Sequence, residues 1–227
     1  MNKTEPPRLH IYEECLLLAI GDRTGNVMIG TEQAALLLAS AILGELLVDE
    51  VISLERSDLP IKFHEAKAYG DMILDDAVAK LSSAKGSYSL QNWIGRISSS
   101  HKLLDKCAHQ LCERGILKSK EEVGWLFNRR YYPELNPDPE NKVRERIRTA
   151  ILGDDEVDSR TATVIGLASQ MELLNSFTTH AERKQYGHRV QAIGRSDSVS
   201  NASRSIAAQQ QTAMLFAITG VFLMMGQ

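Results

Sequence analysis

The stretch from Glu32 to Val48, EQAALLLASAILGELLV, constrains this chain most, because it is apolar on nearly every side of a helix. Such a helix belongs either in a protein core or in a membrane. Its 17 residues would extend roughly 25 Å. A membrane span needs about 20 uninterrupted apolar residues, and here Glu32 and Glu45 lie at or near the ends. We therefore predict that this stretch is the central helix of a helical core. Its weaker stripe consists of Gln33, Ser40 and Gly44.

Composition indicates an intracellular globular protein. The chain has 227 residues, 43% of them hydrophobic and 24% charged, which are ordinary values for a soluble domain. A net charge of −3 gives no global attraction for nucleic acid, and none is expected as a partner. Three cysteines form no disulfide framework, so a reducing, cytoplasmic location is predicted. No signal-peptide pattern precedes residue 11, and Asn2 stands where N-myristoylation needs glycine.

Hydrophobic periodicity predicts a mainly α protein, a single globular helical domain over residues 9–227 preceded by a short mobile arm over residues 1–8. In the first helix, Glu13 and Glu14 lie near the start, where the helix dipole favours anions. Residues 51–63 fit short strands or an irregular connection. The apolar run Ala213–Gly226 is short for a membrane span and is predicted to be part of a buried closing helix. The predicted helices, besides the central one, are Ile11–Ile20, Met72–Leu81, Leu90–Ser98, His101–Arg114, Glu140–Leu152, Ser159–Phe177 and Ile206–Met225.

One segment departs from the helical pattern. Residues 116–132, ILKSKEEVGWLFNRRYY, contain two β-prone arms around the polar stretch Lys118–Glu122, which predicts an amphipathic β-hairpin with its turn in that stretch. Prolines at 133, 137 and 139 end it. The arms join large apolar groups to basic neighbours. The apolar set is Val123, Trp125, Leu126 and Phe127, and the basic set is Lys118, Lys120, Arg129 and Arg130.

Several motifs, in order along the chain, resemble the Golgi phosphoprotein 3 family. The resemblance begins with YEECLLLAIGDRTGNV at residues 12–27 and covers almost the whole chain after residue 10. No single motif is decisive, but their order and spacing together are specific. The later motifs are GELLVDEVI (44–52), GDMILDDAV (70–78), LQNWIGRIS (90–98), LCERGIL (111–117) and LFNRRYYPE (126–134).

The resemblance implies a helical domain with a hairpin on one face. Eukaryotic members bind phosphatidylinositol 4-phosphate at the cytosolic surface of Golgi membranes and adapt glycosyltransferase tails to coat proteins. In a gap-free match, the family's headgroup tryptophan falls on Gly30 and a pocket arginine on Ala39, while two further arginines fall on His101 and Leu104. Lys106 stands one position from a family arginine. These departures indicate a divergent member, with a bacterial source as one alternative.

The hairpin is the first candidate site. Trp125, Leu126 and Phe127 are candidates for shallow membrane insertion, because an aromatic ring with basic neighbours suits the interface of an anionic bilayer. Arg129 and Arg130 would then meet lipid headgroups. The same apolar groups also fit two other roles, packing the hairpin onto the helices or pairing it with another subunit.

A second candidate is the trio His101, Lys102 and Lys106. Lys102 and Lys106 are four residues apart, so on a helix they would share a face that can hold a phosphate. His101 would strengthen that face only when protonated. Asp105 lies within reach and weakens the patch, and a solvated helix surface is the alternative interpretation.

Other chemistry is poorly supported. Cys107 and His109 would point about 200° apart on a helix, so no metal site is expected. Sequence signatures of phosphate loops, nucleophile elbows and zinc proteases are absent, and we expect neither an enzyme nor a cofactor. Asp71, after Gly70, is predicted as a helix N-cap. The basic stretch Lys142, Arg144, Arg146 and Arg148 is expected to be solvated or paired with Glu140 and Glu145, with a contribution to an anion-binding surface as the alternative.

Together these observations favour a non-enzymatic peripheral membrane protein on the cytosolic face of a membrane. Its ligand would be anionic lipid, which the resemblance specifies as phosphatidylinositol 4-phosphate. The alternative is a protein-interaction or oligomerisation module that uses the hairpin and binds no specific lipid, with a homo-oligomer or another protein as partner.

Overall fold

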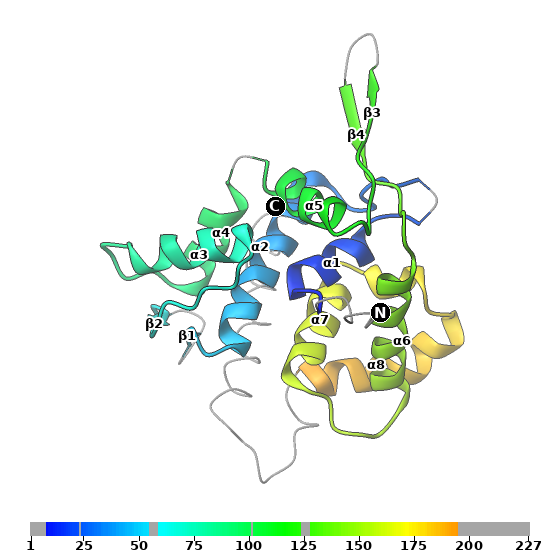
Figure 1. The fold of residues 1–227 in the computed structure, drawn as a ribbon. Helices are drawn as coiled ribbons and strands as arrows, with labels where there is room; N and C mark the ends of the chain where they lie inside the picture. Colours follow the sequence, from blue (N-terminus) through cyan, green and yellow to red (C-terminus); the bar gives the residue numbers. More distant parts are fainter. Residues whose placement is uncertain (1–7, 23, 55–58, 101, 124–127, 195–227) are drawn as a thin grey trace, which may run out of the picture.

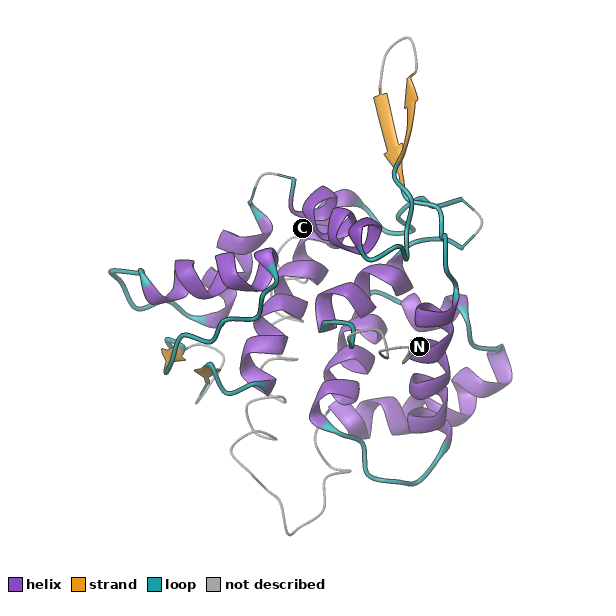
Figure 2. Ribbon diagram, in the orientation of Figure 1, coloured by secondary structure: helices purple, strands orange, loops and turns teal. Residues whose placement is uncertain are grey.

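The protein is mainly α-helical in a computed structural model (Figure 2). The structure describes residues 8–22, 24–54, 59–100, 102–123 and 128–194. The predicted closing helix, Ile206–Met225, lies outside the described residues, as does most of the predicted N-terminal arm.

Two consecutive helices form the centre of the core. Helix α1 (Ile11–Ala19) is buried along its whole length, and α2 (Thr31–Val48) is buried from Leu36 to Leu47. The two helices pack on each other, and α2 also contacts helices on both of its sides. Of the described helices, α2 is the one that is long and apolar enough to cross a membrane, yet 72% of it is buried inside the protein. The prediction of a central core helix is confirmed.

The other helices surround this pair in two groups (Figure 1). The first group packs against α1 and α2 on one side of the pair. The second group covers the pair on the other side. The first group is α3 (Met72–Ser82), α4 (Leu90–Ser98) and α5 (Leu103–Glu113). The second is α6 (Asp138–Leu152), α7 (Ser159–Gln170), the 3-10 turn η1 (Leu173–Ser176) and α8 (His180–Gly194).

Local signals set the start, the buried face and the end of helices in the first group, and the cap at Asp71 is as predicted. The Asp71 side chain accepts hydrogen bonds from the backbone N–H groups of Ile73 and Leu74 and so caps α3. Trp93 points inward from α4 and is 4% exposed. Gly115 follows α5 with a φ of +70°, the left-handed conformation that a helix C-terminus commonly needs.

The strands form two small antiparallel pairs. β1 (Ile52–Ser53) pairs with β2 (Lys62–Phe63), while β3 (Lys120–Val123) and β4 (Asn128–Tyr131) form the predicted hairpin. This hairpin projects from the helical body (Figure 1). Its turn was predicted wrongly, because most of Lys118–Glu122 lies in strand β3. Both faces of that strand are exposed at residues 120–122, so its polar sequence resembles a turn.

The C-terminal half contains two further differences from the prediction. The single helix expected over Ser159–Phe177 ends at Gln170, because Glu172 adopts a left-handed φ of +57° and a 3-10 turn follows. Helix α8 was not predicted at all. Its sequence, HAERKQYGHRVQAIG, has no continuous apolar stripe.

Candidate membrane-binding surface

The base of the hairpin is held against the loop between α1 and α2. The backbone N–H of Tyr132 donates to the carbonyl oxygen of Gly25 (2.7 Å), and the N–H of Lys118 donates to the carbonyl of Pro133 (2.9 Å). Gly25 has a φ of +67°, and a Cβ atom there would lie 2.3 Å from the nitrogen of Pro133. Only glycine permits this approach, so the direction in which the hairpin projects is fixed by backbone contact.

The charges along the hairpin stem are arranged in opposite pairs across the strands. Glu121 stands opposite Arg130, and Glu122 stands opposite Arg129. Directly opposed unlike charges stabilise an antiparallel pair by roughly 0.2–1 kcal/mol. The stem is therefore close to charge balance, with Lys120 as its excess cation.

Arg130, a predicted headgroup ligand, is engaged by the protein itself. Its Nη1 donates to Asp105 Oδ2 on α5 (3.1 Å), and its Nη2 lies 3.9 Å from Glu121 Oε1. The hydroxyl of buried Tyr132 donates to the other Asp105 oxygen (2.6 Å). Burial and this hydrogen bond raise the pKa of Tyr132. Asp105 thus fastens the stem to α5 instead of simply weakening a basic patch, and a lipid phosphate would have to compete with it for Arg130.

The predicted insertion residues come between β3 and β4 in the sequence. Trp125, Leu126 and Phe127 fall between the two strands, outside the described residues. Arg129 lies in β4 at the position opposite Glu122. The roles assigned to these residues remain predictions.

The second candidate site, His101, Lys102 and Lys106, is arranged only partly as its sequence spacing predicted. Helix α5 begins at Leu103, and Lys102 precedes it with a left-handed φ of +56°, so Lys102 and Lys106 do not share a helix face by regular geometry. The backbone remains continuous, since the N–H of Lys106 donates to the carbonyl of Lys102 (2.9 Å). Both side chains are exposed, and neither forms an ion pair with a described residue. His101 lies outside the described residues.

The positions that match the family's headgroup residues differ widely in their solvent exposure. Gly30 is exposed and caps α2, whereas Ala39 is fully buried in the middle of the same helix. Leu104 is half-buried at the start of α5. By this gap-free match, the position of the pocket arginine faces the core of this protein.

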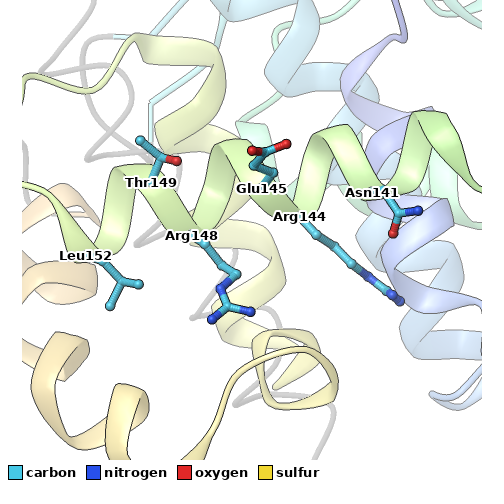
Figure 3. A pocket seen from close by; sticks show the side chains of 6 residues that line it. All are labelled: Asn141, Arg144, Glu145, Arg148, Thr149 and Leu152. Atoms are coloured by element: carbon cyan, nitrogen blue, oxygen red, sulfur yellow. The ribbon is translucent and has the colours of Figure 1, made fainter.

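The arginines of α6 are bound to carboxylates. Arg144 makes two hydrogen bonds to Asp22 (2.9 and 2.7 Å) and lies 2.5 Å from Glu140. Arg148 pairs with Glu182 of α8. These two arginines line a pocket of about 450 Å³, and Leu152 is also part of its lining (Figure 3). The pairing with Glu140 was predicted, and the long-range partners were not. Occupied in this way, Arg144 and Arg148 offer little to an anionic surface.

Sequence reasoning missed a network of buried ion pairs in the core. Three carboxylates on α1 and α2 are each paired with an arginine from another part of the chain, at full or nearly full burial of the acid. Burial raises the pKa of Glu13. The interpretation of Glu13 and Glu14 as dipole partners alone was incomplete. The pairs are Glu13 with Arg114, Glu14 with Arg146, and Glu45 with Arg160.

Glu45 also fixes the start of α1. Its Oε2 accepts the backbone N–H of Ile11 (2.5 Å), and Arg160 donates to the carbonyl of Leu9. Burial acts to raise the pKa of Glu45, but hydrogen bonds from His10 and Arg160 lower it on balance. A charged residue within the apolar α2 stretch was the sequence signal for this network. The network ties α1 and α2 to the rest of the fold, because its three acids are turned away from solvent and each is held by an arginine from another segment.

The cysteine and histidine residues of α5 are not gathered into a site. Cys107 is fully buried, whereas His109 is exposed and lies 3.6 Å from Glu113 on the same helix. Burial raises the pKa of the Cys107 thiol. Within the described ranges, no group of three metal-binding side chains comes together.

Comparison with known proteins relates this chain to one family. A family model described as Golgi phosphoprotein 3 (GPP34) matches residues 11–210. Among the relatives, a vacuolar protein sorting-associated protein 74 from Schizosaccharomyces pombe is 20% identical in an alignment 226 positions long, which covers 86% of this chain and 67% of the relative.

Proposed function

This chain belongs to the Golgi phosphoprotein 3 family, and from that premise we propose that it binds reversibly to an anionic membrane surface without catalysing a reaction. The family resemblance names phosphatidylinositol 4-phosphate as the lipid and the cytosolic face of the membrane as the location. The family's trafficking role supports a non-enzymatic protein with protein partners.

The projection of the hairpin carries this proposal. β3 and β4 extend from the helical body, and the sequence between them contains Trp125, Leu126 and Phe127. Aromatic rings are favoured at the level of the headgroups, where one end of the side chain is apolar and the other is wet. We infer that this segment inserts shallowly.

The electrostatic part of the attachment is assigned to the start of α5. Lys102 and Lys106 are exposed and make no ion pair with a described residue, in contrast to Arg130. Each basic residue near an anionic surface contributes about 1 kcal/mol. Peripheral proteins usually combine such attraction with apolar insertion, since neither alone gives stable binding.

Liposome co-sedimentation tests the proposal. Neutral vesicles are compared with vesicles that carry phosphatidylinositol 4-phosphate and with vesicles matched in charge by phosphatidylserine, each at two salt concentrations. Selective pelleting with the inositide supports a specific headgroup site. Equal pelleting with both anionic lipids supports general electrostatic attachment, and no pelleting with any vesicle refutes membrane binding.

Substitutions separate the two contributions. Lys102→Gln and Lys106→Gln should each weaken binding on the order of fivefold at low salt, the equivalent of about 1 kcal/mol. Lys67→Gln removes the same charge from a lysine that is already paired with Asp49 (2.7 Å). Lys67→Gln should therefore weaken binding much less, and an equal loss in all three variants would refute a local site.

One observation favours a second function, a protein-interaction module. The stem is nearly charge-balanced, which suits a protein partner or a second copy of the chain better than an anionic bilayer. If the hairpin joins subunits, Trp125→Asp should convert an oligomer into a monomer in light-scattering measurements of mass. An unchanged mass would argue against this alternative.

A further inference from the structure

One stretch of the chain carries no negatively charged side chain. Residues 77–104 contain neither aspartate nor glutamate, although 29 of the 227 residues are acidic. The stretch runs from the middle of α3 through α4 to the start of α5, and its basic residues are Lys80, Lys85, Arg96 and Lys102. The net charge of the whole protein is −3. A local cationic surface of this kind can attract an anionic partner that the protein as a whole would repel.

The fold keeps this stretch on one side of the molecule. Helices α3 and α4 both pack against α2, and Figure 1 shows them with their connection on the flank of the body, whereas the hairpin projects from the end next to α5. The Lys80 ammonium group donates to the hydroxyl of Ser100 just after α4 (3.2 Å), and it is also paired with Asp76 (2.7 Å). Lys80 is therefore less available to a partner than the cations that follow it.

The guanidinium group of Arg96 is held in a fixed orientation. It lies 4.3 Å from the ring centre of Tyr88 and 5.2 Å from the ring centre of Trp93. Stacking on ring faces orients the guanidinium plane and leaves the N–H donors at its edge free to bind other groups. Arg96 is exposed and forms no ion pair with a described residue. Its donors therefore remain available in the fork that matches a carboxylate.

A second available cation stands close to the same aromatic ring. A Cβ atom added to Gly86 would lie 3.0 Å from Cζ of Tyr88, so the connection between α3 and α4 folds closely against the ring on which Arg96 stacks. Lys85 immediately precedes Gly86 and is exposed. It forms no ion pair with any residue in the described ranges. Lys85 and Arg96 thus place two cations beside one aromatic ring.

The exposed side chains of α4 are polar. Asn92 is exposed one helical turn before Arg96, on the same face of the helix, and its amide can donate to a carboxylate. Attachment to a bilayer usually combines electrostatic attraction with apolar insertion, but the large apolar side chains of α4 are at most 4% exposed. These are Leu90, Trp93, Ile94 and Ile97. The chemistry therefore favours an acidic protein segment over a lipid surface.

We propose that the α3–α4 surface, formed by Lys85, Asn92 and Arg96, binds a segment of a protein partner that is rich in aspartate and glutamate. Arg96 binds one carboxylate through two parallel N–H donors, and Lys85 attracts a neighbouring carboxylate. This site differs from the hairpin and from the lysines at positions 102 and 106. It goes beyond the proposed membrane attachment and does not depend on it.

Fluorescence anisotropy with a labelled poly-L-glutamate peptide, measured without lipid, tests the proposal. The unmodified protein should bind the peptide at about 50 mM salt and lose most of this binding at about 300 mM, because salt screens exposed charges. Arg96→Gln and Lys85→Gln should each weaken low-salt binding about two- to fivefold, the range for one exposed ion pair. Arg96→Lys keeps the charge but not the planar fork, so it should restore only part of the loss.

Lys142→Gln is the matched control. Lys142 is exposed on α6, in the group of helices on the other side of α1 and α2, and its substitution should leave peptide binding unchanged. Absence of binding at low salt, or an equal loss in Lys142→Gln, would overturn the proposal.

Pelleting with phosphatidylserine vesicles separates this surface from membrane attachment. Arg96→Gln should pellet as the unmodified protein does. A loss of pelleting in Arg96→Gln, with peptide binding retained, would assign the surface to the membrane and overturn the proposal. If the unmodified protein does not pellet, the membrane proposal fails, and the peptide measurement still decides this one.

Discussion

Gly25→Ala should destabilise the protein far more than an ordinary glycine substitution in a turn. An L-residue at a φ of +67° costs about 1 kcal/mol or more. The added Cβ would also lie 2.3 Å from the Pro133 nitrogen and 2.6 Å from the Tyr132 carbonyl carbon, which are backbone atoms and cannot rotate away. Separating the segments would break the Tyr132–Gly25 hydrogen bond, worth about 1 kcal/mol, and disturb the packing of buried Tyr132. With overpacking at about 1–3 kcal/mol, we expect a total loss of about 3–5 kcal/mol.

Gly115→Ala is the matched control for this prediction. Gly115 has nearly the same backbone conformation, with a φ of +70°, but no atom lies within 4 Å of the position its Cβ would take. Only the conformational cost of about 1 kcal/mol should remain. Urea unfolding of both variants gives their free energies of unfolding. The two values can be compared when the free energy depends on urea concentration with a similar slope in both. Losses equal to within about 0.5 kcal/mol would refute the argument that close backbone contact fixes the hairpin base.

Three other changes test the contacts described above. Arg160→Met leaves the Glu45 carboxylate buried without its arginine and should cost about 3–5 kcal/mol in thermal or urea unfolding; adding Glu45→Gln should recover part of that loss, and no recovery would contradict an ion-pair role. Asp71→Ala removes the α3 cap and the acceptor of the Tyr12 hydroxyl (2.7 Å) and should lower the free energy of unfolding by about 2 kcal/mol, whereas the exposed Asp76→Ala should change it little. Asp105→Asn removes the acid that engages Arg130 and should strengthen binding to anionic vesicles severalfold at low salt but not at high salt; unchanged binding would show that Arg130 takes no part.

Most helices could be predicted because their signals are local. Apolar periodicity defined α1 to α7, and caps such as Asp71 and Gly115 act within a few residues of the helix end. Helix α8 was missed because its apolar residues form no stripe. A usable signal was nevertheless present, since Thr179 and Glu182 form a capping box in which each side chain accepts the other's backbone N–H.

The candidate site was less predictable, because its decisive contacts are long-range. Arg130 and Asp105 are 25 positions apart, and their pairing depends on how the hairpin docks on α5. Arg144 and Asp22 are separated by 122 positions. Helical spacing also failed at Lys102, whose left-handed backbone places it outside the regular helix. Counting the basic residues in the sequence therefore overestimates the number of cations that are available to an anionic ligand.

This difference bears on how the proposed attachment responds to salt. On the stem, Glu121 pairs in register with Arg130 and Glu122 with Arg129, so the net charge that remains for long-range attraction is small. Lys102 and Lys106 then supply most of the salt-sensitive part, which screening weakens. Insertion of an apolar segment is not screened, because it depends on the area removed from water. Raising salt should therefore reduce binding to the level that insertion alone supports, and Trp125→Ala should weaken binding at every salt concentration. Full binding by that variant would refute insertion and leave the charges of α5 as the sole attachment.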